Sequence, residues 1–293
     1  FRNMSDSRTR RLILTCVAGL TALLVVIIAG KSAFGKRAGQ EAETHPVPVN
    51  LNETLKNEMS DTSSLAGFDK MVQNYLTYWG IHGASISVMR NDSLLFAKGY
   101  GEADSGKKME PGNILRMASV SKLVTAVGIM VLQERGLLNL KDHVFGPDGI
   151  LNDSTYNAAI KDTLYYRITV EDLLRHKGGF SKRGGDPMFS TRWIMMQNGW
   201  SEVPSQERLM EVQLKRRLKF VPGSAQEYSN FGYLALSMVI EKVSGMDYET
   251  FIQENVLRPV GCVDFHIAGN YYKHKFPNET RYYVQHDDEP AEE

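Results

Sequence analysis

Apolar residues at helical spacing mark the beginning of the folded part of the chain. Between residues 65 and 79 they recur three and four positions apart, which predicts an amphipathic helix. Two apolar runs follow at residues 84–89 and 94–100, and the polar pair Asn91-Asp92 separates them. Short apolar runs on either side of such a pair predict a β-hairpin. The fold is therefore expected to open with a helix and two antiparallel strands.

Residues 123–132 are apolar at nearly every position. A helix formed by them would be apolar on almost every side, which predicts that it is buried. A mostly helical middle follows, and the last part of the chain offers two short strands. Helices are predicted at residues 169–175, 206–218, 232–243 and 248–256, and strands at residues 263–267 and 281–284. Two strands do not form a stable sheet alone, so the hairpin is expected to need further strands.

A different apolar segment precedes this domain. Residues 12–30 carry no charge and are flanked by basic residues, and a run of this length can span a bilayer. We expect a cytoplasmic N-terminus at residues 1–11, a transmembrane signal-anchor at 12–30, a flexible tether at 31–64 and a folded domain at 65–293. A cleaved signal peptide and a lipoprotein attached through Cys16 are the alternatives. We expect the domain to lie outside the cell membrane, on its periplasmic side.

Composition argues against several classes of function. Lys plus Arg and Asp plus Glu both number 34, and no basic block lies outside the extreme N-terminus, which disfavours nucleic-acid binding. The two cysteines, Cys16 and Cys262, are too few for a disulfide framework. The histidines show no metal-ligand spacing, so neither a metal nor another cofactor is expected.

Ser119 and Lys122 are the first candidates for chemistry. Their spacing places a hydroxyl and an amine one turn apart on one face of the helix that begins there. A serine becomes nucleophilic when a nearby base accepts its proton, and a partly buried lysine can act as that base. The same spacing occurs at Ser105 and Lys108, in a polar, glycine-containing stretch that is typical of a turn. Taken alone, Ser119 and Lys122 also fit a helix cap and a solvated charge.

Tyr228 and Asn230 form the second candidate pair, in the turn before a predicted helix. Residues two apart in an extended segment point the same way, so the phenol and the amide are expected to share one cleft. Between two ammonium groups a phenol has a lowered pKa and can accept a proton from a serine. The alternative is that Tyr228 is a buried aromatic residue and Asn230 a helix cap.

Taken together, four segments resemble the superfamily of class C β-lactamases, D-alanyl-D-alanine carboxypeptidases and esterases of the same fold. The resemblance runs in order from about Leu65 to Val263. The segments are Arg116 to Lys122, Leu173 to Phe180, Pro222-Gly223 ahead of Tyr228 to Tyr233, and Val243 to Gly245. It implies an α+β fold of the β-lactamase/transpeptidase type, with an antiparallel sheet flanked by helices and a helical subdomain.

The resemblance also implies a role for each candidate residue. Ser119 is expected to be the acylated nucleophile, and Lys122 to accept or relay its proton. Tyr228 is expected to be the base that activates the serine and later the deacylating water. Asn230 is expected to bind the substrate amide or to hold Lys122. The backbone N–H of Ser119 is expected to form half of an oxyanion hole.

One motif of this superfamily is missing from the chain. A Lys-Thr-Gly or His-x-Gly on a late strand is expected after Tyr228 and is not found. His176-Lys177-Gly178 matches the His-x-Gly pattern but precedes Tyr228 in the sequence. We therefore interpret it as a decoy and not as the missing motif. The closing strands of the sheet are missing as well, and a fragment of a longer enzyme is favoured over a naturally short relative. We therefore predict weak or absent turnover, with acylation of Ser119 as the step that can survive.

The leading hypothesis is a membrane-anchored, extracytoplasmic serine acyl hydrolase that forms a covalent acyl-enzyme. A β-lactam, a peptidoglycan stem peptide and a small ester all fit as substrates. The alternative is a membrane-tethered binding or sensor module that keeps the fold without turnover. Between residues 181 and 202 lies a segment rich in Met and aromatic residues, which either walls an acyl pocket or packs in the core.

Overall fold

The computed structural model describes residues 50–183, 185–269 and 271–283. The predicted cytoplasmic segment, the signal-anchor and the tether up to residue 49 lie outside these ranges. No helix within the described ranges is long and apolar enough to cross a membrane.

Residues just before Leu65 bond to the sheet, although a flexible tether was predicted up to Ser64. After α2 (Leu51–Thr54) comes the short 3-10 helix η2 (Asn57–Ser60). The Asn57 side-chain oxygen accepts the backbone N–H of Gly99 at 2.7 Å. The buried Ser60 hydroxyl donates to the carbonyl of Ala97 at 2.9 Å. These side chains pair with backbone groups of a strand, so the folded domain begins earlier than the apolar pattern suggested.

The sheet is antiparallel, with the described strands in the order β1 (Gly83–Arg90), β2 (Ser93–Asp104) and β3 (Lys107–Lys108). Asn91 and Asp92 connect β1 to β2, and both have left-handed φ angles, of 50° and 59°. Two consecutive residues in this conformation turn the chain with the twist that a tight hairpin requires. The predicted hairpin is confirmed.

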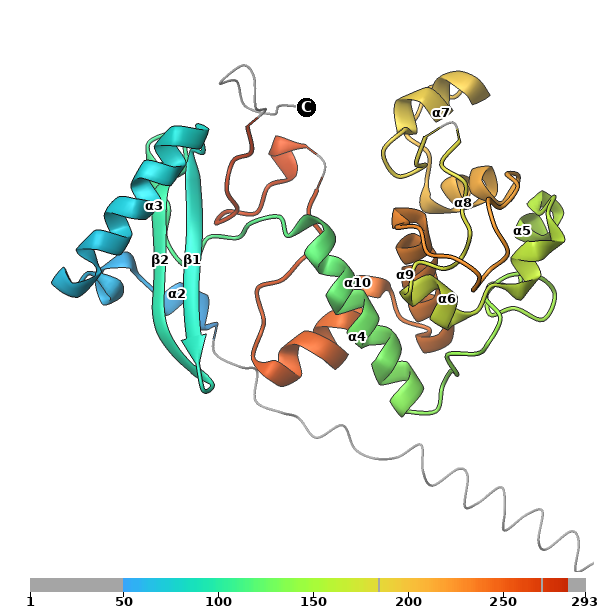
Figure 1. The fold of residues 1–293 in the computed structure, drawn as a ribbon, viewed down its shortest axis with the longest axis horizontal. Helices are drawn as coiled ribbons and strands as arrows, with labels where there is room; N and C mark the ends of the chain where they lie inside the picture. The colour runs from blue at the N-terminus through green and yellow to red at the C-terminus, as the bar shows by residue number, and fades with distance from the viewer. Residues whose placement is uncertain (1–49, 184, 270, 284–293) are drawn as a thin grey trace, which may run out of the picture. The chain divides into compact units, whose positions relative to one another are not determined.

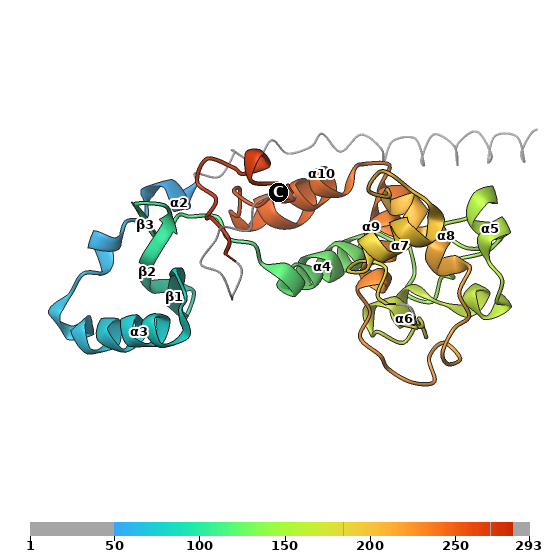
Figure 2. The same ribbon diagram turned by 90° about the horizontal axis from the view of Figure 1, so that it is seen from above.

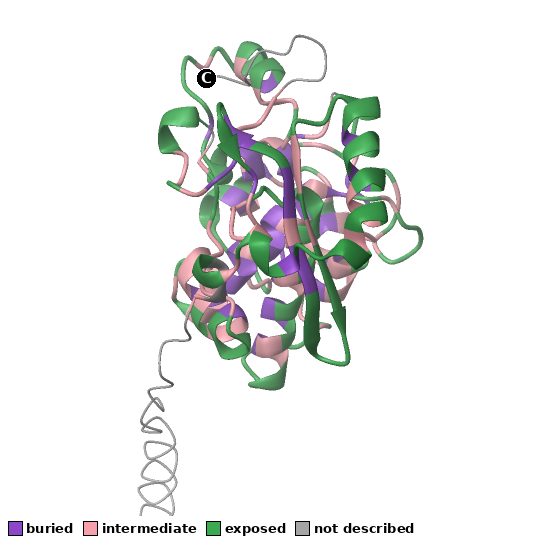
Figure 3. Ribbon diagram, turned by 90° about the vertical axis from the view of Figure 1, so that its left-hand side faces the viewer, coloured by how far each residue is buried: buried purple, intermediate pink, exposed green. Residues whose placement is uncertain are grey.

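One helix covers the hairpin. In α3 (Ala66–Trp79), which confirms the predicted helix, Val72 and Leu76 are buried against Phe96 and Tyr100 of β2. Figures 1 and 2 show α3 running alongside the two long strands. The turn end of the hairpin is exposed and is coloured green in Figure 3. Its exposed apolar residues are Val88, Met89, Leu94 and Leu95.

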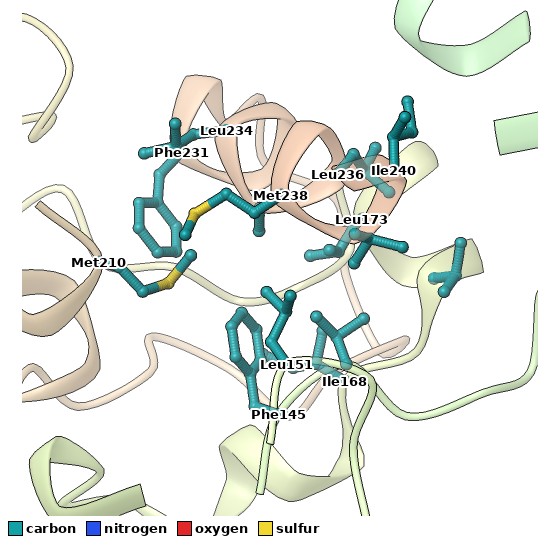
Figure 4. Packing of buried hydrophobic residues seen from close by; sticks show 14 of the residues in the cluster. Phe145, Leu151, Ile168, Leu173, Met210, Phe231, Leu234, Leu236, Met238 and Ile240 are labelled. Atoms are coloured by element: carbon teal, nitrogen blue, oxygen red, sulfur yellow. The ribbon is translucent and has the colours of Figure 1, made fainter. Parts of the chain in front are cut away.

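The remaining helices form the larger hydrophobic core. The two longest, α4 (Ser121–Glu134) and α9 (Asn230–Ser244), pack against each other. The others are α5 (Ser154–Ala159), α6 (Val170–Leu174), α7 (Thr191–Asn198), α8 (Gln206–Leu214) and α10 (Tyr248–Ile252). Figure 4 shows Phe231 and Leu236 of α9, which belong to one cluster of buried residues with Leu151, Ile168 and Leu173. Burying each such side chain contributes about 1.5–3 kcal/mol.

α4 is buried on one face only, whereas its sequence predicted burial on nearly all sides. Leu123 is 67% exposed and Met130 is 47% exposed, while Ile129 on the opposite face is fully buried. Gly128 lies on the buried face, where a Cβ atom would meet the Ile252 side chain at 2.8 Å. A glycine therefore allows α4 to approach α9 and α10 closely.

The strand predicted at residues 263–267 is wrong, and the strand predicted at 281–284 lies partly outside the described residues. Residues 263–267 form no strand, and the described part of 281–284 forms none either. Nearby, Ile114 pairs with Glu279 only as an isolated bridge. The backbone N–H of Arg281 donates to the carbonyl of Ala103 in β2 at 2.7 Å, but this contact is not continued into a strand within the described residues. The short helices α5 and α7 were not predicted, because each has too few residues for a clear apolar period.

Candidate active site

Ser119 lies where a helix begins. It belongs to the 3-10 turn η4 (Ala118–Val120), which continues directly into α4. The preceding residue, Ala118, has a φ of +45°, a left-handed conformation that costs a residue with a side chain about 1–3 kcal/mol. The Ser121 hydroxyl donates to the Ala118 carbonyl and fixes this turn. The strained backbone thus sets the direction in which the Ser119 side chain leaves the helix.

The structure brings all four predicted site residues together. The Lys122 ammonium donates to Ser119 Oγ at 3.1 Å and to Asn230 Oδ1 at 2.8 Å. The Tyr228 hydroxyl lies 2.7 Å from Ser119 Oγ, within hydrogen-bonding distance. Ser119 Oγ is therefore in contact with both groups that are candidates to take its proton.

Ser229 explains why both neighbouring side chains are available to the site. Its hydroxyl accepts the N–H of Gly232 at 3.0 Å and so caps α9. Because Ser229 is the cap, the amide of Asn230 is left to bind Lys122, and the suggestion that Asn230 is the cap was wrong. Tyr228 is not a buried aromatic residue, since 44% of it is exposed.

The Lys122 ammonium lowers the pKa of Tyr228. The hydrogen bond from Lys122 is the largest cause and that from Ser119 the second, while partial burial opposes both. Lys122 Nζ also lies 4.9 Å from the centre of the Tyr228 ring. A second ammonium group, Lys182, lies over the same ring at 5.9 Å. The contacts with Lys122 and Ser119 outweigh burial and the opposing charge of Asp186 and so favour the phenolate, which is the form that can accept a proton from serine.

Asp186 is a site residue that the sequence analysis missed. Its Oδ2 accepts the side-chain N–H of Asn230 at 2.9 Å, and its Oδ1 accepts the backbone N–H of Met188 at 3.0 Å. It lies 44 positions before Asn230, so no local pattern links the two. The available signal was that Asp186 is the only carboxylate in residues 181–201.

His176 also lies at the site, although it was interpreted as a decoy. Its ring is 4.6 Å from the ring of Tyr228, centre to centre, and its Nδ1 accepts the N–H of Ser229 at 3.3 Å. Burial is the main cause that lowers the pKa of His176, and Lys122 and Lys182 add to it.

The other serine and lysine with the spacing of Ser119 and Lys122 are Ser105 and Lys108. Ser105 lies in the turn between β2 and β3, as predicted.

A cleft of 710 Å³ opens beside Ser119, Lys122 and Asn230. From the Met- and aromatic-rich segment, only Met188 and Phe189 line it. Trp200 packs against the larger core, whereas Trp193 and Met196 are exposed, so the predicted acyl pocket and the predicted packing role each apply to only part of the segment. Further side chains around the cleft are Gln206, Tyr233, Leu234, Glu241, Asp247, Tyr248, Glu249 and Ile267.

No group of three or more His, Cys, Asp or Glu side chains suited to a metal ion occurs in the part of the chain that the structure describes.

Comparison with known sequences identifies related proteins. The sequence model of the Beta-lactamase family matches residues 68–293. A penicillin-binding protein of Bacillus subtilis (strain 168) is 27% identical over 165 residues, which cover 56% of this chain and 32% of that protein. A protein of Escherichia coli (strain K12) that is provisionally named D-alanyl-D-alanine carboxypeptidase is 26% identical over 215 residues, covering 67% and 47%. The chain thus spans a third to a half of the length of these relatives.

A solved structure shares the fold. The D-alanine carboxypeptidase AmpC from Burkholderia cenocepacia superimposes with a TM-score of 0.57 at 17% sequence identity, covering 79% of this chain and 58% of that chain. Together with the described sheet and helices, this similarity confirms the predicted α+β fold of the β-lactamase/transpeptidase type.

Proposed function

Because the chain belongs to the Beta-lactamase family, we propose that it is a serine acyl hydrolase of the β-lactamase and penicillin-binding type. The observation that carries this proposal is the position of Ser119 Oγ, 3.1 Å from the Lys122 ammonium and 2.7 Å from the Tyr228 hydroxyl. A hydroxyl held between an ammonium group and a phenol of lowered pKa is prepared to become a nucleophile.

In the proposed first step, Tyr228 takes the hydroxyl proton of Ser119 while Ser119 Oγ bonds to the carbonyl carbon of the substrate. The carbonyl electron pair moves to its oxygen and forms a tetrahedral intermediate. When that intermediate collapses, the bond to the leaving nitrogen or oxygen breaks, and the leaving group takes the proton from Tyr228. The product of this step is an ester between the acyl group and Ser119.

In the second step, Tyr228 takes a proton from a water molecule, whose oxygen attacks the acyl carbon. The ester bond to Ser119 breaks, and the proton returns to Ser119 Oγ. Lys122 stabilises the phenolate form of Tyr228 in both steps, and Asn230 holds Lys122 at 2.8 Å. The released product is the free carboxylic acid.

The proposed substrates are β-lactams, peptidoglycan stem peptides or small esters. All three carry a carbonyl group that Ser119 can attack. The names of the penicillin-binding protein and of the carboxypeptidase related to this chain support the first two classes. The cleft beside Ser119 offers apolar contacts from Met188 and Phe189 to the acyl group.

Covalent labelling tests this proposal. The full chain is incubated with a fluorescent penicillin and, separately, with a fluorophosphonate, and the adduct is located by mass spectrometry. We expect an adduct on Ser119 with at least one reagent and none in the Ser119→Ala variant. A folded sample without any Ser119 adduct would refute the proposal. Reversible penicillin binding in such a sample would favour the binding or sensor module instead.

We further propose that residues 12–30 anchor the protein in the cell membrane with the catalytic domain on the periplasmic side. The uncharged run and its basic flanks support this placement, and peptidoglycan-type substrates lie on that side of the membrane. The test is protease accessibility. Protease added to spheroplasts should degrade the domain, and protection of the domain until the membrane is lysed would contradict the proposed orientation.

A further inference from the structure

His176 joins the end of one helix to the turn that carries Tyr228. It follows α6 and has a φ of +57°, a left-handed conformation in which histidine and asparagine are enriched. Its backbone N–H donates to the carbonyl of Leu173 at 3.1 Å, which ties the residue to α6. Its own carbonyl accepts the N–H of Glu227 at 2.9 Å. The backbone of His176 is therefore fixed on both sides.

The side chain of His176 binds the same turn a second time. Its Nδ1 accepts the N–H of Ser229 at 3.3 Å, while its carbonyl binds Glu227. The residues on either side of Tyr228 are thus both hydrogen-bonded to His176. The imidazole ring lies 4.6 Å from the Tyr228 ring and 5.1 Å from the Tyr233 ring, centre to centre. Tyr228 has little freedom to move relative to this histidine.

We propose that His176 is a positioning residue that holds the Tyr228 hydroxyl against Ser119 by accepting the N–H of Ser229 and packing on the phenol ring. This inference rests on the proposed function, in which Tyr228 is the base. His176 itself does not touch Ser119 in this arrangement, and it acts through the turn at residues 227–229. A shift of about 1 Å in a catalytic group can cost a hundredfold in rate, so a residue that fixes this turn matters for catalysis.

The arrangement requires an unprotonated His176, because a protonated Nδ1 carries a hydrogen and cannot accept the Ser229 N–H. The charged and titratable groups around the ring are Lys122 from α4, Lys182 from the loop between α6 and α7, and Tyr228 and Tyr233. Burial and the two ammonium groups lower the pKa of His176, which keeps the ring neutral at neutral pH. Acidification below that pKa breaks the bond to Ser229.

Two substitutions separate the hydrogen bond from the rest of the side chain. His176→Asn places an oxygen where Nδ1 lies, and asparagine tolerates the left-handed backbone. His176→Phe keeps a ring of similar size but has no acceptor. His143→Asn is the matched control, since His143 is exposed and lies outside the site. The rate of fluorophosphonate labelling of Ser119 is measured from about pH 5 to pH 8, with thermal unfolding recorded for each variant.

We expect labelling to fall about 10- to 100-fold in His176→Phe and to be largely retained in His176→Asn above pH 7. The ratio of the wild-type rate to the His176→Asn rate should be constant above pH 7 and fall as the pH drops through the lowered pKa of His176, since only the wild type loses its acceptor there. An equal loss in both variants, or a ratio that does not change with pH, would overturn the proposal and indicate a purely structural histidine.

A second measurement does not depend on activity. In NMR spectra of the full chain, the Ser229 amide proton should shift with the titration of His176 in the wild type and in His143→Asn, and it should not do so in His176→Asn. If the wild type were not labelled at Ser119, the proposed function would fail. The Ser229 titration would still decide whether His176 holds the turn, and an amide shift independent of pH would refute that contact.

Discussion

Asp186 accepts a hydrogen bond from the Asn230 side-chain nitrogen at 2.9 Å and thereby determines which end of that amide faces Lys122. With the nitrogen held by Asp186, the amide oxygen points to the Lys122 ammonium at 2.8 Å. The carboxylate is itself fixed by the backbone N–H of Met188. The position of the lysine therefore depends on a residue from a distant part of the chain.

Asp186→Ala should slow the acylation of Ser119 about tenfold. Without the carboxylate, the Asn230 amide can turn and direct its nitrogen toward Lys122, which loses a charge-assisted hydrogen bond of about 1.5–3 kcal/mol. The rate of fluorophosphonate labelling measures the effect. Asp186→Asn keeps an acceptor oxygen and should lose less. If both variants lost the same amount, the negative charge of Asp186, and not its hydrogen bond, would be the cause.

Tyr228→Phe should lower the acylation rate by about a hundred- to ten-thousandfold, the range typical of losing a general base. The phenol contacts Ser119 Oγ, and no other acid–base group except Lys122 is seen to do so among the described residues. Since Tyr228 is 44% exposed, the midpoint of thermal unfolding should change little. Tyr78→Phe, at a position that is 79% exposed on α3, is the matched control. A Tyr228→Phe enzyme that acylates at the wild-type rate would rule out Tyr228 as the base.

The acylation rate should rise with pH and reach a plateau with a midpoint below 10. The active form of Tyr228 is the phenolate, and Lys122 lowers the pKa at which that form appears from the ordinary value near 10. Because the pKa is lowered, the base is present at a lower pH than in a free tyrosine. A pH profile of Ser119 labelling measures this midpoint. A midpoint at or above 10 would show that Lys122 does not tune the phenol.

Gly128→Val should destabilise the domain by about 1–3 kcal/mol. The added methyl groups would enter space next to Ile252 and Ile240, whose side chains already lie 2.8 Å and 3.1 Å from the position of a Cβ atom. Denaturant unfolding measures the free energy. Gly67→Val on α3 is the matched control, because Gly67 is exposed and a Cβ there meets nothing within 4 Å. Because valine has a higher helix propensity than glycine, Gly67→Val should not destabilise the domain, and similar losses at both positions would mean that packing against Ile252 and Ile240 does not set the cost.

Elements whose signal is local could be predicted from the sequence. The helix at residues 66–79 and the hairpin have clear apolar periods, and the pair at Ser119 and Lys122 is separated by one turn of one helix. Tyr228 and Asn230 were predictable for the same reason, since both lie in one extended turn beside the cap Ser229. Each of these relationships is set by residues within a few positions of one another.

Features that depend on distant contacts were not predictable. Asp186 meets Asn230 across 44 positions, and His176 meets Ser229 across 53. Residues 263–267 have the apolar composition of a strand, but pairing depends on a neighbour that the segment itself does not specify. The exposed face of α4 could not be predicted either, because an apolar pattern does not show which other elements cover it.

Relieving the left-handed backbone strain at Ala118 would raise the stability of the domain but reduce the reactivity of Ser119. A glycine there would relieve the strain of about 1–3 kcal/mol, and a chain selected for stability alone would be expected to carry one. It would also let the nucleophile sample several directions, only one of which meets Tyr228. The methyl group of Ala118 therefore limits conformational freedom at the reactive serine, and engineering that seeks a higher melting temperature should leave this residue unchanged.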